Sequence, residues 1–129
     1  MKTLFFFAFS LILYSQFSFT QSANLDPQEV KALKEIGEKL GLVGKKKWDF
    51  DKDPCSAQGG WEEYIFCDCS FESNTTCHVT QILISSQNIS TSLPTEFTKL
   101  PYLQLLDLSR NYLRGTIPPE WATMRLSNL

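Results

Sequence analysis

The chain has 129 residues, with 14 acidic residues, 12 basic residues, one histidine and four cysteines. This length supports one domain at most. The net charge of −2 gives no basic footprint for nucleic acid. The single histidine, His78, excludes a site built from several histidines, and 20% charged with 13% aromatic residues excludes compositional disorder.

The amino terminus has the pattern of a secretory signal peptide. Lys2 is a minimal positive region, and an apolar run follows from Leu4 to Tyr14 with Ser10 as its one interruption. Small residues at Thr20 and Ala23 then bracket the expected cleavage site. We predict a signal peptide over residues 1–22 and no membrane-spanning segment in the rest of this chain. The mature chain then carries 11 basic and 14 acidic residues.

Four cysteines lie close together in a chain predicted to enter an oxidising compartment, which favours disulfides. Zinc is disfavoured because one residue separates Cys67 from Cys69 and no CxxC pair is present. A Cys67–Cys69 bond would close a strained, very small ring. Two pairings remain open: Cys55–Cys67 with Cys69–Cys77, which closes the shorter loops and is slightly favoured, or Cys55–Cys69 with Cys67–Cys77. Asn74 and Asn88 each begin an N-glycosylation triplet, which agrees with export.

Residues 26–41 predict one amphipathic helix within a cap over residues 23–78. Asp26 is the expected N-cap, Pro27 occupies the first helical position, and Glu29 completes a capping-box spacing. Gly41 is the expected stop. The predicted apolar stripe is Val30, Leu33, Ile36 and Leu40, and a Glu35–Lys39 pair is predicted on the wet face.

Aromatic residues are dense between this helix and the half-cystines, and we interpret them as filling a small core rather than forming a carbohydrate platform. They are Trp48, Phe50, Trp61, Tyr64 and Phe66.

The last third of the chain carries a sequence repeat. Its full pattern, LxxLxxLxLxxNxLxGxIP, begins at Leu100 and ends at Pro118. The pattern returns one period earlier from Val79, and its start returns one period later at Leu126 and Leu129. This pattern, with its period of roughly 23–24 residues, is that of a leucine-rich repeat. We predict an α/β solenoid with a disulfide-bonded amino-terminal cap, and repeats over residues 79–99 and 100–123 with an incomplete one over 124–129.

Each position in the repeat has a structural role. The LxL core forms a strand whose leucines point into the coil. Asn111 is expected to turn the chain and to bond backbone groups of adjacent coils, whereas Gln87 holds that place less well in the first coil. Residues that flank the inward leucines look outward on the concave face, and they are our candidates for ligand contact: Gln81, Leu83, Ser85, Leu105, Asp107 and Ser109.

Three segments resemble the extracellular start of plant leucine-rich-repeat receptor-like serine/threonine kinases: Asp53-Pro54-Cys55, Cys77–Thr80 and Leu108–Trp121. The Cys67-Asp68-Cys69 insert and the Pro-Glu-Trp ending are most similar to the branch that carries a malectin-like domain. The resemblance covers the whole chain. It implies a non-catalytic recognition module on the extracellular face of the plasma membrane, with a protein, peptide or cell-wall carbohydrate ligand and a co-receptor repeat ectodomain as partners.

The chain departs from that family by ending at Leu129, on a consensus leucine, without a kinase motif. We therefore expect a fragment or truncated product whose last coil exposes apolar surface, and we expect no catalytic residue, cofactor or metal. Asp49, Asp51 and Asp53 alternate but lack the spaced Gly and final Glu of a calcium loop. The alternative is a short secreted repeat protein that acts as a decoy or inhibits a cell-wall-degrading enzyme.

Overall fold

The computed structural model describes residues 22–44, 48–56 and 64–129. Of the predicted signal peptide, only residue 22 lies within these ranges. Trp61 lies outside them. The described strands form one four-stranded sheet: β1 (Asn24–Leu25), β2 (Ile65–Ser70), β3 (Thr76–Leu83) and β4 (Leu105–Asp107). β3 is central because it pairs in parallel with β1 and β4 along its length and antiparallel with β2.

The pairing of β3 with β4 follows the sequence repeat. Gln81, Ile82 and Leu83 pair with Leu105, Leu106 and Asp107, so each pair joins equivalent positions of successive repeats. A parallel bridge from Leu105 to Asn128 continues the stacking into the last coil. The inward leucines and isoleucines are buried, with Ile82, Ile84, Leu103 and Leu106 each at most 2% exposed. The leucine-rich-repeat part of the fold prediction is therefore confirmed, with each repeat strand paired to the equivalent residues of the next.

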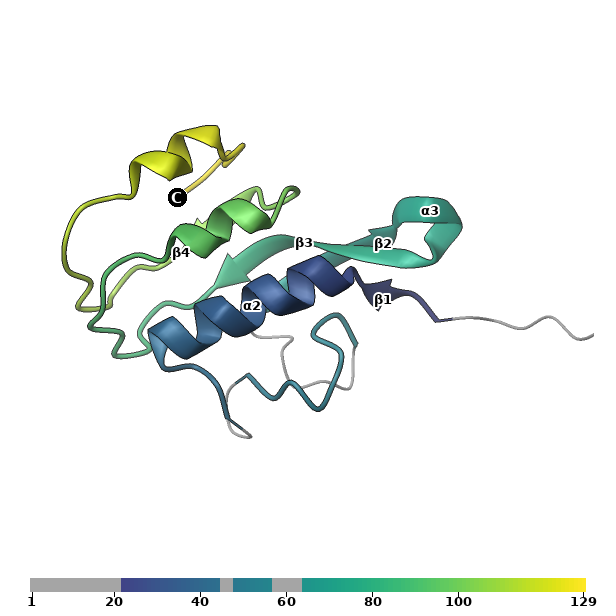
Figure 1. The fold of residues 1–129 in the computed structure, drawn as a ribbon, viewed down its shortest axis with the longest axis horizontal. Helices are drawn as coiled ribbons and strands as arrows, with labels where there is room; N and C mark the ends of the chain where they lie inside the picture. The colour runs from purple at the N-terminus through teal and green to yellow at the C-terminus, as the bar shows by residue number, and fades with distance from the viewer. Residues whose placement is uncertain (1–21, 45–47, 57–63) are drawn as a thin grey trace, which may run out of the picture.

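The predicted helix forms as α2 (Pro27–Leu40). The Asp26 carboxylate accepts hydrogen bonds from the backbone N–H groups of Gln28 and Glu29, and Gly41 ends the helix in the left-handed conformation at φ +68°. Leu33 and Ile36 are fully buried, and Leu40 is almost so. Figure 1 shows α2 lying over the sheet and running nearly along β3. The buried residues of its apolar stripe belong to the same core cluster as Val79 and Ile82 of β3.

Two details of the helix prediction were wrong. Glu29 does not complete a capping box, because the Asp26 N–H already donates to the Cys77 carbonyl at 3.0 Å. The buried Glu29 carboxylate instead hydrogen-bonds to His78 and Val79. Glu35 and Lys39 do not pair with each other as predicted, because each forms an ion pair with a residue outside the helix. Lys39 pairs with Glu96, and Glu35 pairs with Lys99, whose ammonium lies 2.7 Å from the carboxylate.

Those two ion pairs tie α2 to η1 (Thr95–Lys99), a 3-10 helix in the first repeat coil. A second 3-10 helix, η2 (Pro119–Thr123), stacks on η1 (Figure 1). The Trp121 ring packs edge-on against Phe97 at 5.5 Å, and its indole N–H donates to the Pro94 carbonyl at 3.0 Å. Three successive helices therefore cover the side of the core opposite the outward face of the sheet.

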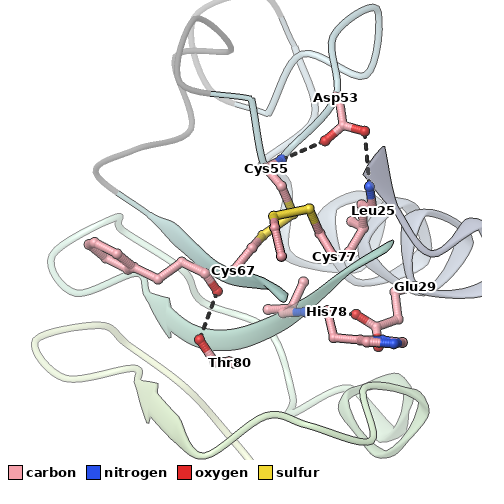
Figure 2. The surroundings of a disulfide bond; sticks show 11 residues. Leu25, Glu29, Asp53, Cys55, Cys67, Cys77, His78 and Thr80 are labelled. Carbon is pink, nitrogen blue, oxygen red and sulfur yellow. Dashed lines mark hydrogen bonds and ion pairs between the residues drawn. A yellow bond between two sulfur atoms is a disulfide. The ribbon is translucent and has the colours of Figure 1, made fainter. Parts of the chain in front are cut away.

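Two disulfides cross-link the cap: Cys55–Cys67 ties the loop to β2, and Cys69–Cys77 ties β2 to β3. This is the pairing that closes the shorter loops. Figure 2 shows the surroundings of the Cys55–Cys67 bond, with Asp53 above it. The Asp53 carboxylate accepts from the backbone N–H groups of Leu25 and Cys55 at 3.1 and 2.8 Å. Asp53 therefore fixes the loop that carries Cys55 to the strand that precedes α2.

The aromatic residues do not all fill the cap core as predicted. Trp48 is 1% exposed, and Phe50 and Tyr64 pack against the core. Phe66, however, is 42% exposed. The cause is strand alternation, because its neighbour Ile65 turns inward and pairs with the buried Ile82.

Candidate functional site

The candidate site is the side of the sheet turned away from the core, which we name the outer sheet face. It is defined by Phe66 in β2, Gln81 and Leu83 in β3, and Leu105 and Asp107 in β4. The registers place Phe66 opposite Gln81 and Gln81 opposite Leu105, so these three form one row across the three strands. Leu83 and Asp107 form the next row.

Four of the six residues predicted to face a ligand thus lie together on paired strands. The other two, Ser85 and Ser109, follow the strands, where the pairing continues through hydrogen bonds from Ile84 N–H to Asp107 O and from Ser86 N–H to Ser109 O. An open groove of about 290 Å³ lies on this part of the sheet, lined by Leu83, Leu105, Leu106, Asp107, Asn128 and Leu129. The structure therefore brings the predicted residues to one continuous surface.

Asp107 is the carboxylate of this surface. The hydroxyl and backbone N–H of Ser109 hydrogen-bond to it, and with the nearby charge of Arg110 they lower the pKa of Asp107 below its ordinary value. The backbone bond is 2.9 Å long. Asp107 is therefore a fixed negative charge at one end of the outer sheet face.

A second carboxylate lies on the same face of the hairpin, where β2 pairs Asp68 with His78. The hydroxyl and backbone N–H of Ser70 bond to Asp68 and, helped by the charge of His78, lower its pKa. Asp68 and Asp107 thus stand near opposite ends of the outer sheet face, and both are ionised at neutral pH.

Sequence reasoning missed the three rings at the Asp68 end of this face. His78 lies between the fully buried Cys77 and Val79, so its side chain points outward. Its ring centroid lies 4.3 Å from Tyr102 and 4.5 Å from Phe71. The repeat gave a signal for this stacking, because Tyr102 holds in the next coil the position that His78 holds in the first.

His78 is held from the helix side by Glu29. One Glu29 carboxylate oxygen lies 2.7 Å from His78 Nδ1, and the other accepts from the Val79 backbone N–H at 2.8 Å. Figure 2 shows Glu29 reaching toward β3 from α2. This contact orients the imidazole. Because His78 also contacts Phe71 and Tyr102, the Glu29 carboxylate orients the whole ring cluster.

The two glycosylation triplets begin in turns and not within the paired strands of the outer sheet face. Asn74 is exposed in the tight turn α3 (Phe71–Asn74), and Asn88 is exposed in the turn after β3. Both residues have positive φ angles, 64° and 57°, which asparagine tolerates better than most residues. Each side chain therefore stands on a surface turn.

Asn111 performs the role predicted for it. Its side-chain oxygen accepts from the backbone N–H groups of Gln87 and Ile89, and its amide group donates to carbonyl oxygens in both coils, at Ile84 and Leu108. Gln87 makes one side-chain bond, to the Ser85 carbonyl at 3.1 Å. The asparagine therefore fixes the height of one coil on the next and with it the spacing of the rows on the outer sheet face.

Apolar surface is also exposed on the side of the last described coil. Ile117 and Leu129 are 59% and 63% exposed. Two open hollows of about 300 and 390 Å³ adjoin Trp121 and these two residues. No helix within the described ranges is long and apolar enough to cross a membrane.

Comparison with known proteins agrees with this architecture. The family model described as Leucine Rich Repeat matches residues 102–124. Two probable leucine-rich-repeat receptor-like serine/threonine-protein kinases of Arabidopsis thaliana are 50% and 42% identical to the chain over 94% and 97% of its length. The chain spans 13% of the length of each of these relatives, and the match is confined to their repeat ectodomain.

Two solved structures are similar in fold. The leucine-rich-repeat ectodomain of the receptor kinase SOBIR1 from Arabidopsis thaliana has a TM-score of 0.51 and 21% identity, over 83% of this chain and 67% of that one. A plant ice-binding protein has a TM-score of 0.64 and 25% identity, over 81% of this chain and 32% of that one.

Proposed function

Because the chain is a leucine-rich-repeat module homologous to the extracellular part of plant receptor-like serine/threonine kinases, we propose that it is the ligand-facing amino-terminal start of such a receptor. The observation that carries this proposal is the outer sheet face, where Gln81, Leu83, Leu105 and Asp107 form two rows. Three of these residues, Leu83, Leu105 and Asp107, also line an open groove. A surface of apolar and polar side chains on a rigid sheet suits recognition of a protein, peptide or carbohydrate.

The cap supports a secretory location for this module. Its two disulfides persist in an oxidising compartment and not in the cytosol. We place the module on the extracellular face of the plasma membrane, with N-glycans on Asn74 and Asn88. Chain secreted from plant cells should lose two steps of apparent mass on enzymatic deglycosylation, and one step in each single Asn→Gln variant.

The test of recognition uses the full receptor that carries this chain, expressed on plant protoplasts and exposed to fractions of apoplastic fluid. Phosphorylation of the receptor is the readout. Leu105→Arg and Asp107→Ala together should abolish the response, because they place a cation and remove the anion in adjacent rows of the face. Glu38→Ala, on the exposed side of α2, is the matched control. A response that survives the double change would remove ligand recognition from this surface.

A further inference from the structure

We propose that the outer sheet face binds a neutral, pyranose-based oligosaccharide, with the rings of Phe66 and Tyr102 as its two stacking surfaces. The inference rests on the proposed recognition function and names the class of ligand. It follows from the position of the two rings, from the uncharged side chains beside them and from the two carboxylates near the ends of the face.

The first ring is supplied by the hairpin. A bulge between Phe66 and Cys67 makes Thr80 an extra residue on β3, so Phe66 stands opposite Gln81 and shares its side of the sheet. The Thr80 hydroxyl donates to the Phe66 carbonyl at 3.2 Å and fixes the bulge. Phe66 is 42% exposed, whereas Leu42, Trp48 and Ile65 of the described part of the cap are at most 4% exposed. An exposed phenyl ring on a rigid strand is a surface available for stacking.

The second ring is held in place before any ligand arrives. Tyr102 contacts the rings of His78 and Phe71 at centroid distances of 4.3 and 4.6 Å, and it is still 42% exposed. Since Glu29 fixes His78 from behind, the tyrosine ring has a rigid support. Binding to a preorganised ring loses less side-chain entropy than binding to a mobile one.

The separation of the two rings suits a chain of sugars. Phe66 lies on β2 and Tyr102 precedes β4, so two strand spacings of about 4.8 Å separate them across the sheet. Tyr102 also comes three residues before Leu105, which adds an offset of about 10 Å along the strands. Gln81 lies in the row of Phe66, and the exposed Gln104 lies between Tyr102 and Leu105. Amide groups donate to and accept from hydroxyl groups equally well. Rings for the C–H faces and amides for the hydroxyls are the groups that an oligosaccharide requires.

Charge selects a neutral sugar over an acidic one. Phe66, Gln81, Gln104 and Tyr102 carry no charge, whereas Asp68 and Asp107 place fixed negative charges toward the two ends of the face. Arg110 is the cation that acts on Asp107. A uronate chain laid across both rings would meet carboxylates at like charge, which is unfavourable. A neutral chain meets no such repulsion.

The test measures binding of cellohexaose, xylohexaose and hexagalacturonate to the full secreted chain by titration calorimetry. One of the two neutral hexaoses should bind, and the acidic one should not. Phe66→Ala and Tyr102→Ala should each weaken that binding at least tenfold, whereas Tyr102→Phe should retain it. Tyr112→Ala is the matched control, because Tyr112 is 70% exposed but lies past the turn at Asn111.

Near-ultraviolet circular dichroism and disulfide mapping establish that each variant is folded. The proposal is overturned if neither neutral hexaose binds at millimolar concentration or if hexagalacturonate binds better. It is also overturned if neither Phe66→Ala nor Tyr102→Ala weakens binding. If no oligosaccharide binds but the receptor response still requires Leu105 and Asp107, the carbohydrate proposal is wrong and the proposed recognition function is retained.

Discussion

Glu29 in the capping helix and His78 in the first repeat strand are bound to each other, with Oε1 2.7 Å from Nδ1. The same carboxylate accepts the Val79 N–H at 2.8 Å. On this edge of β3, β1 pairs with Thr76 and Cys77, and β4 pairs with Gln81 and the residues after it. Glu29 therefore occupies the gap between two neighbouring strands and supplies the acceptor that a backbone carbonyl would otherwise provide.

Removal of Glu29 should destabilise the whole chain. Glu29→Ala leaves the buried Val79 N–H without its acceptor and His78 without its partner, so we expect a loss of about 3 kcal/mol in the free energy of unfolding. Glu29→Gln retains an acceptor oxygen and should cost less. Urea denaturation measures both, with Glu38→Ala on the same helix as the control. Equal stability of Glu29→Ala and Glu38→Ala would contradict this role.

Asn111 should matter far more than the glutamine at the same place in the preceding coil. Asn111→Ala removes bonds to two backbone N–H groups and to carbonyls of both coils, and we expect a loss of about 2–3 kcal/mol. Gln87→Ala removes one bond and should cost less than about 1 kcal/mol. Thermal unfolding of the two variants gives the comparison, and similar losses would mean that the asparagine does not fix the coils.

The ion pairs between α2 and η1 should make stability depend on pH. Burial raises the pKa of Glu96, but the hydrogen bond from Lys39, a backbone hydrogen bond and the charges of Lys39 and Lys99 outweigh burial and hold it below the ordinary value of 4.5. A lowered pKa in the folded state adds stability above pH 4.5, and this stability is lost as the pH falls through the folded value.

Lys39→Met should therefore reduce the loss of stability on acidification between roughly pH 5 and pH 3. The variant and the unchanged chain are compared by urea denaturation at each pH. Lys34→Met, at an exposed position on the same helix, should keep the original slope. If Lys39→Met and Lys34→Met respond to pH alike, the Lys39–Glu96 pair contributes nothing to folding.

Gly37 is required by the packing of Trp48. A Cβ at residue 37 would lie 2.9 Å from Trp48 Cε3 and 3.1 Å from Val43 Cγ2. Gly→Ala in an open helix gains about 1 kcal/mol, but here the overlap should turn that gain into a net loss of about 1 kcal/mol. In a Trp48→Leu background the same change should become neutral or stabilising. A gain in melting temperature for Gly37→Ala alone would refute the overlap.

The stacking of the coils could be predicted from the sequence because it depends on local spacing. The repeat period fixes which residues of adjacent coils pair. The observed pairs, Gln81–Leu105 and Leu83–Asp107, join equivalent repeat positions as that period requires. The limits of α2 follow from Asp26 and Gly41, whose capping chemistry acts within one turn of the chain. Four of the predicted ligand-facing residues lie on the paired strands because the period places them there.

The rest depended on contacts between distant residues. Glu29 has a capping-box position, yet it bonds His78 and Val79, far along the chain, because the sheet has already taken the Asp26 N–H. Phe66 turned outward because its neighbour Ile65 pairs with the buried Ile82, and a pattern of aromatic residues does not encode which of two strand neighbours faces the core. Tyr102 was detectable through its repeat position, but its stacking on His78 required Glu29 to place that ring.

The central claim, that this chain is the ligand-facing start of a receptor kinase, is tested most directly by the full-length transcript read through the codon for Leu129. We predict an open frame that continues into further repeats, a membrane-spanning segment and a serine/threonine kinase domain. A stop codon directly after Leu129 would contradict the claim. It would favour the alternative of a short secreted repeat protein, whose partner would then have to cover the exposed Ile117 and Leu129.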